Sequence, residues 1–91
     1  MDLTEIRPQI DSIDSQLVEL LAKRFDLVEK VAIYKKENSI NSLQPGRWQE
    51  ILDTRKEQAE GLGIDPEMIE EIWNIIHKFA LKMQNSILEN K

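Results

Sequence analysis

A cation interrupts the apolar pattern of the first helical segment, and a second cation follows it on the same face. Hydrophobic residues follow one another at spacings of four and three between Ile6 and Tyr34, and Arg24 occupies one of these positions. Lys35 follows eleven residues later, so at about 100° per residue both side chains project from one helix face, about 20° apart. A buried cation is costly without an anion beside it. The pattern predicts a site for an anionic ligand, unless Arg24 reaches solvent along its alkyl chain or pairs with an acid of a partner subunit.

A third cation, Arg7, lies on a different face of the same segment. It precedes Arg24 by seventeen residues, which places it about 100° around a helix. Arg7 therefore cannot easily serve the pocket of its own chain, but in an antiparallel or crossed dimer it would reach the pocket of the partner. An ordinary solvated arginine is the alternative, although a cation near a helix N-terminus is mildly unfavourable.

The last third of the chain carries polar side chains on a half-buried ridge. Trp73, His77, Ala80 and Gln84 are spaced four, three and four residues apart, which places them on one side of a helix. Gln84 could donate a hydrogen bond to a ligand, or it could simply cap a backbone group or meet solvent. His77 is interpreted as a packed or surface residue. Arg47 either lies at the surface or completes the cluster of cations. Their joint arrangement predicts a cavity between helices that fixes a small dianion.

One helix must carry most of these cations, and it is too long for a compact subunit. The spacing predicts a helix from about Leu3 to Lys36, with Pro8 tolerated in its first turns. At 1.5 Å per residue it would be about 50 Å long, whereas a compact globule of this chain length is only about 30 Å across. The apolar stripe therefore needs a second subunit, and we expect an intertwined homodimer.

Two shorter helices complete the expected fold. Residues 37–43 are polar and predict a loop, after which residues 44–47 open a second helix that the glycines at 61 and 63 end. Residues 65–67 combine a capping carboxylate, a proline and an acid, which is typical of the start of a third helix. No strand pattern or repeat occurs. The sequence predicts a single all-α domain over residues 1–91.

The composition excludes several kinds of function. The chain has no cysteine and one histidine, so we expect no disulfide, no zinc cluster and no Ser-His-Asp triad. A net charge of −5, from 17 acidic and 12 basic residues, argues against a nucleic-acid partner. No apolar run approaches the roughly 20 residues of a membrane span, and the N-terminus lacks the features of a signal peptide. We expect a cytoplasmic protein that needs neither a metal nor a cofactor.

Three stretches of the first helix resemble the all-helical chorismate mutases. They are IRPQIDSID at residues 6–14, LLAKR at residues 20–24 and VAIYK at residues 31–35, similar to the patterns R-x-x-I-D-x-I-D, L-L-x-x-R and I-x-x-x-K of that family. The likeness continues through residues 44–47 and ends at Gln84, so it covers almost the whole chain. The spacing from Arg7 to Arg24 to Lys35 is quite specific.

The resemblance implies a role for each matching residue. Arg24 would bind one substrate carboxylate, and Arg7 from the other subunit would bind a carboxylate as well. Lys35 and Gln84 would donate hydrogen bonds to the ether oxygen, while Arg47 would organise the carboxylate end and position Lys35. The implied reaction is the Claisen rearrangement of chorismate to prephenate in phenylalanine and tyrosine biosynthesis. This reaction needs positioning and charge stabilisation rather than a triad or a metal.

Three pocket positions depart from the family pattern. Gln44 stands where the family usually has an acid and Trp48 where it has a glutamate, both near the substrate's ring hydroxyl, and Ala80 stands where a serine is common. Two alternatives therefore stay open: an isochorismate-pyruvate lyase on the same fold, and a non-catalytic helical dimerisation or regulatory module. Residues 43–48 are similar to mutase domains fused to DAHP synthase, which leaves open either a free-standing enzyme or fusion to or association with that enzyme.

Overall fold

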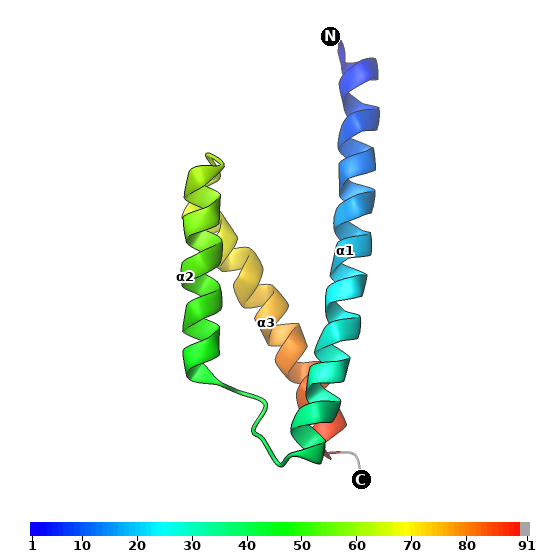
Figure 1. Cartoon of the computed structure of the whole chain (residues 1–91). Helices are drawn as coiled ribbons and strands as arrows, with labels where there is room; N and C mark the ends of the chain where they lie inside the picture. The colour runs from blue at the N-terminus through cyan, green and yellow to red at the C-terminus, as the bar shows by residue number, and fades with distance from the viewer. Residues whose placement is uncertain (90–91) are drawn as a thin grey trace.

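The computed structural model describes residues 1–89, which form three helices (Figure 1). Helix α1 spans Leu3–Glu37, α2 spans Pro45–Gly61 and α3 spans Pro66–Glu89. No strand occurs in this range, so the predicted all-α class, with one very long helix and two shorter ones, is confirmed. Within the same range, no helix combines the length and the apolar character that crossing a bilayer requires.

Local sequence signals set the helix ends. The Asp2 carboxylate accepts a hydrogen bond from the backbone N–H of Glu5 at 3.2 Å and caps α1. Helices α2 and α3 each begin with a proline. The missing N–H of proline costs nothing there, because the first N–H groups of a helix have no carbonyl acceptor within it. Asp65 accepts from the backbone N–H of Glu67 at 2.9 Å at the start of α3. Gly63, with a φ of 74°, takes the left-handed conformation that lets the chain turn away after α2.

Helix α3 holds the other two helices together. It packs against both α1 and α2, whereas among the described residues no Cα atom of α1 lies within 8 Å of one of α2. In Figure 1, α3 runs diagonally from the upper part of α2 to the last turns of α1. This arrangement brings the C-terminal half of α1 and the C-terminal half of α3 together at one end of the molecule.

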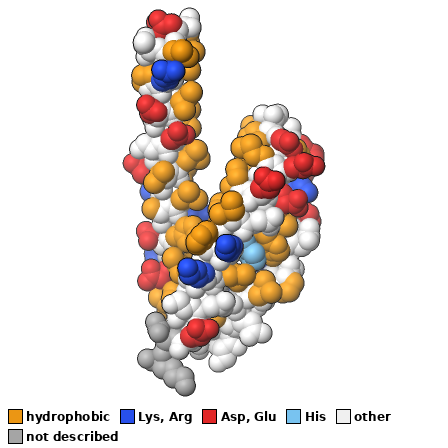
Figure 2. Space-filling model, turned by 180° about the vertical axis from the view of Figure 1, so that it is seen from behind, with side chains coloured by type: hydrophobic (Ala, Val, Ile, Leu, Met, Phe, Trp, Pro, Cys, Tyr) orange, Lys and Arg blue, Asp and Glu red, His pale blue; other side chains and the backbone are white. Residues whose placement is uncertain are grey.

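The single chain buries almost no large side chain. Its buried hydrophobic residues are Ala32, Ala59, Ile76 and Ala80. The chain measures 55 × 25 × 15 Å with a radius of gyration of 16.5 Å, whereas a compact chain of this length would have about 12 Å. The N-terminal half of α1 stands clear of the other helices and carries a line of hydrophobic side chains (Figures 1 and 2). An apolar surface of this extent is typical of one that another chain covers.

Candidate active site

A cavity of about 190 Å³ lies between the C-terminal half of α1, the first turns of α2 and the C-terminal half of α3. Every predicted site residue except Arg7 lines it: Arg24, Lys35, Gln44, Arg47, Trp48, Ala80 and Gln84. The described residues contribute three permanent cations and no carboxylate to its wall. The cavity therefore has the charge that a small anion requires.

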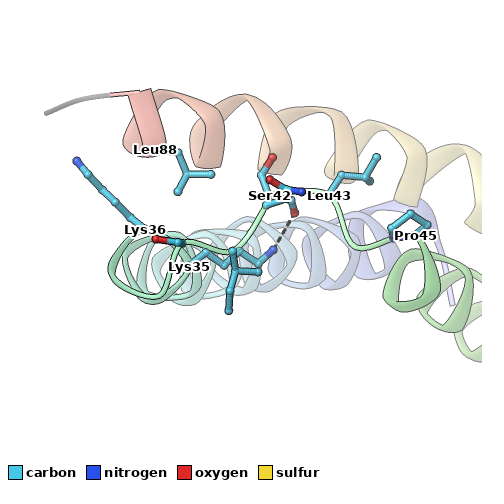
Figure 3. Close-up of a pocket in the computed structure, with 9 residues that line it drawn as sticks. Lys35, Lys36, Ser42, Leu43, Pro45 and Leu88 are labelled. Carbon is cyan, nitrogen blue, oxygen red and sulfur yellow. Dashed lines mark hydrogen bonds between the residues drawn. The ribbon is translucent and has the colours of Figure 1, made fainter.

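A larger and more open hollow of about 760 Å³ lies along the loop between α1 and α2 (Figure 3). Lys35 lines both spaces, but the larger one has neither an arginine nor Gln84 in its described wall. Bidentate recognition of carboxylates is a property of guanidinium groups. The smaller cavity is therefore the candidate site, and the hollow beside the loop is not.

Lys35 and Gln84 form the central polar contact of the cavity. The Lys35 Nζ donates to the Gln84 Oε1 at 2.9 Å. It also donates to the backbone carbonyl of Ser42 at 2.8 Å (Figure 3). Because a lysine only donates, the amide oxygen must face it, which leaves the amide N–H groups and one ammonium N–H for a ligand. Burial lowers the pKa of Lys35. Gln84 is only 8% exposed, so the alternative that it meets solvent is wrong.

Arg24 lies half-buried in the cavity with an unused donor. Its Nη1 is buried and has no hydrogen-bond partner within residues 1–89. Burial lowers the pKa of Arg24, and the positive charges of Arg55 and Arg47 lower it further. A guanidinium stays charged even so. An anion in the cavity would satisfy both the donor and the charge, as would an acid from a partner subunit.

Arg47 lines the cavity at its edge. Its Nη1 pairs with Glu50 Oε1 at 2.7 Å, and both side chains are more than half exposed. An exposed pair of this kind contributes about 0.2–1 kcal/mol, so Arg47 can exchange Glu50 for a ligand at little cost. No hydrogen bond joins Arg47 to Lys35 among the described residues. In this structure Ser42 and Gln84, rather than Arg47, hold the Lys35 ammonium.

Arg7 lies far from the cavity of its own chain. It is exposed in the second turn of α1, and the 28 residues to Lys35 correspond to about 42 Å of helix. The geometry agrees with the prediction that Arg7 cannot serve the pocket of the chain that carries it.

His77 lines the cavity but was not among the predicted site residues. His77 of α3 stacks on Trp48 of α2, with ring centroids 3.8 Å apart and planes 15° from parallel, and both rings line the cavity. Burial lowers the pKa of His77, and the Arg24 charge lowers it further, so the imidazole is neutral at neutral pH. The sequence feature that could have identified His77 is its position, because it precedes Gln84 by two helical turns on the same ridge.

The sequence of the chain is similar to those of known proteins. The family model for chorismate mutase type II matches residues 6–85. The chain is 36% identical over 84 residues to a T-protein of Enterobacter agglomerans, covering 92% of this chain and 22% of that protein. It is also 36% identical over 70 residues to a T-protein of Haemophilus influenzae, covering 77% and 19% respectively. A 4-amino-4-deoxychorismate mutase of Streptomyces venezuelae is 22% identical over 90 residues, which cover 99% of this chain and 87% of that protein.

The chain therefore spans about a fifth of the length of the T-proteins that it matches, but nearly all of the shorter Streptomyces protein. The family match includes every residue that lines the cavity, from Arg24 to Gln84, and Arg7 as well. With most of the chain inside that match, the protein belongs to the chorismate mutase type II family.

Proposed function

We propose that the chain catalyses the rearrangement of chorismate to prephenate. The observation that supports this most directly is the Lys35–Gln84 pair in a cavity whose permanent charges, within residues 1–89, are all positive. Chorismate carries two carboxylates and an ether oxygen, which are the groups that such a cavity complements. The product lies on the route to phenylalanine and tyrosine, and we expect the enzyme to work in the cytoplasm without a metal or cofactor.

The rearrangement requires positioning and charge stabilisation rather than acid–base chemistry. In the rearrangement, the ether C–O bond breaks while a C–C bond forms, and no proton leaves or arrives. The enzyme must hold the flexible substrate in its compact chair-like conformer, which converts binding energy into rate. It must also stabilise negative charge that grows on the ether oxygen. The free ammonium N–H of Lys35 and the free amide N–H of Gln84 are preorganised donors for that oxygen.

The carboxylates are assigned to arginines. Arg24, whose buried Nη1 has no partner among the described residues, binds one of them, and Arg47 assists at the edge of the cavity. The second clamp is Arg7 of the partner subunit in an intertwined homodimer. Two features support this dimer: the exposed apolar stripe of α1 and a single-chain core that, within residues 1–89, consists of four mostly small hydrophobic residues. In such a dimer the overhanging half of α1 is covered and carries Arg7 to the other subunit.

We expect the protein to be dimeric at micromolar concentration and to lose helicity as it dissociates, because the stripe of α1 has no cover within one chain. Sedimentation equilibrium with circular dichroism at several concentrations checks this. Leu17→Asp, on the stripe, should shift the protein to monomer, whereas Ser15→Asp, on the opposite face of α1, should not. A folded wild-type monomer would contradict the architecture.

Gln84→Glu should make activity depend on acid. The Lys35 ammonium lies 2.9 Å from the amide oxygen, so it favours the ionised carboxylate of the variant. An ionised carboxylate cannot donate to the ether oxygen, whereas the protonated carboxyl can. We therefore expect kcat/KM of the variant to rise at least about tenfold between about pH 8 and about pH 5, relative to wild type. Parallel pH profiles for the two proteins would remove Gln84 from the reaction.

A second candidate reaction is the cleavage of isochorismate to salicylate and pyruvate. The Trp48–His77 stack favours it, because within residues 1–89 this wall of the cavity carries aromatic rings and no acid. Incubating the purified chain with chorismate and with isochorismate separates the two reactions. Prephenate from chorismate supports the mutase, and salicylate with pyruvate supports the lyase. No product from either substrate would support a non-catalytic dimerisation module.

The wider setting of the chain is a separate proposal. The matched T-proteins are about five times as long as the matched region, as their 22% and 19% coverage shows. The similarity of residues 43–48 to mutase domains of DAHP synthases motivates an association with that enzyme. Co-purification of a tagged chain with DAHP synthase tests it, and a chain that purifies as a homodimer alone would contradict it.

A further inference from the structure

The Trp48–His77 stack gives the cavity an aromatic wall that joins α2 to α3. The two rings lie 3.8 Å apart and nearly parallel, and each side chain is half-buried. A ring held face to face in this way keeps its plane, since tilting it would break the stack. The edge of the imidazole is therefore held in the plane that the stack sets.

Three other polar side chains of the cavity each make one hydrogen bond within the protein. The Gln84 amide oxygen accepts from Lys35 at 2.9 Å. The Ser42 hydroxyl donates to Asn85 Oδ1 at 2.6 Å, and the Gln44 amide nitrogen donates to the Asn41 carbonyl at 3.1 Å. The imidazole of His77 makes no hydrogen bond within residues 1–89. In its neutral form it offers one donor and one acceptor to whatever fills the cavity.

The substrate has one polar group that the cations and Gln84 do not account for. Its two carboxylates match the arginines, and its ether oxygen matches the Lys35–Gln84 pair. The hydroxyl on its ring remains, and a hydroxyl also offers one donor together with acceptor lone pairs. The ring hydroxyl and the unpaired imidazole of His77 are therefore complementary.

We propose that His77, held against Trp48, is a specificity-determining residue that binds the ring substituent of the substrate, accepting a neutral hydroxyl and rejecting a protonated amine. This inference rests on the proposed mutase function. The relative from Streptomyces venezuelae is named for 4-amino-4-deoxychorismate, in which an amine replaces that hydroxyl. An alkyl amine is protonated at neutral pH, so it would enter as a further cation beside Arg24, Lys35 and Arg47. Within residues 1–89 no carboxylate of the cavity wall can balance it.

The test compares kcat/KM for chorismate and for 4-amino-4-deoxychorismate at neutral pH in four proteins. Wild type should prefer chorismate by more than about a hundredfold, as a site does when the alternative leaves polar groups unpaired. His77→Gln keeps a neutral donor and acceptor and should retain most of this preference. His77→Glu matches the glutamine variant in size and adds the missing carboxylate. It should therefore shift the ratio of kcat/KM towards the amine by at least about tenfold. His77→Leu should lose about tenfold in kcat/KM for chorismate, because the hydroxyl then has no partner.

The results separate this inference from the function on which it rests. If wild type prefers the amine, or if the Glu and Gln variants share the wild-type ratio, His77 does not read the substituent and the inference fails while the mutase function stands. If wild type converts neither compound, the proposed function fails and the inference fails with it. Should the His77 variants not fold, Trp48→Leu removes the stacking face and keeps the imidazole. Trp48→Phe keeps a stacking face and is the control. A Trp48→Leu protein with the wild-type ratio of kcat/KM for the two compounds would also overturn the proposal.

Discussion

Lys35→Ala should reduce kcat for chorismate by about 10²–10³-fold, the effect expected for loss of one preorganised donor to a developing oxyanion. The Lys35 ammonium is the charged donor closest to Gln84, and its two protein hydrogen bonds fix the direction of its remaining N–H. Gln84→Ala should have a smaller effect that still exceeds about tenfold, because a neutral donor contributes less than a charged one. Steady-state assays of both variants give the measurement.

The control for this experiment is another lysine of the same helix. Lys30 is exposed on α1 and does not line the cavity, so Lys30→Ala should keep wild-type kcat. All three variants should sediment like the wild type, since none removes a residue of the apolar stripe. Equal activity of Lys35→Ala and Lys30→Ala would exclude Lys35 from the reaction.

Arg7→Ala and Arg24→Ala should each abolish most activity when each is made as a pure protein. In the proposed dimer every pocket takes Arg24 from one subunit and Arg7 from the other, so either variant leaves each pocket with one carboxylate clamp. Truncating one clamp of a desolvated charge pair typically costs about 2–5 kcal/mol, which corresponds to a loss of at least about thirtyfold in kcat/KM. Expression and dimer content need to match the wild type before rates are compared.

Mixing the two inactive proteins then reports where the arginines act. After co-refolding in equal amounts, about half of the dimers are mixed, and two-fold symmetry places both defects in one pocket and neither in the other. The mixture should recover about a quarter of the wild-type activity, because one pocket in each mixed dimer is intact. Recovery of no activity would mean that both arginines serve the same subunit's pocket. A mixture of Arg24→Ala with wild type controls for the refolding yield.

The three helices could be predicted from sequence because their signals are local. Asp2, Pro45, Gly63 and Asp65 act on the backbone within a few residues of themselves. Both ends of α1 and α2 and the start of α3 lie within about one residue of the predicted bounds. The face shared by Arg24 and Lys35 was likewise fixed by helical periodicity, and both line the cavity. Periodicity within one helix is independent of how the helices pack.

The contacts between helices could not be predicted in the same way. The Lys35–Gln84 hydrogen bond joins residues 49 positions apart, and the Trp48–His77 stack depends on how α2 crosses α3. A single histidine on a half-buried ridge gives no pattern that separates packing from binding, so the sequence favours a packed or surface residue at His77. Trp48 stood out only as a departure from the family pattern, whereas its stacking partner became apparent only in three dimensions. The role expected of Arg47 in positioning Lys35 came from the resemblance, and here Ser42 and Gln84 hold that ammonium.

The central claim is that this cavity is complementary to the transition state of the rearrangement rather than to a dicarboxylate in general. The most direct test is the affinity of a rigid bicyclic ether dicarboxylate that mimics the chair-like transition state, measured as an inhibition constant and by calorimetry. Wild type should bind this compound at least about a hundredfold more tightly than chorismate, and Lys35→Ala should lose most of that advantage while still binding chorismate. Equal affinity of wild type for the two compounds, or an advantage that survives in Lys35→Ala, would contradict the account.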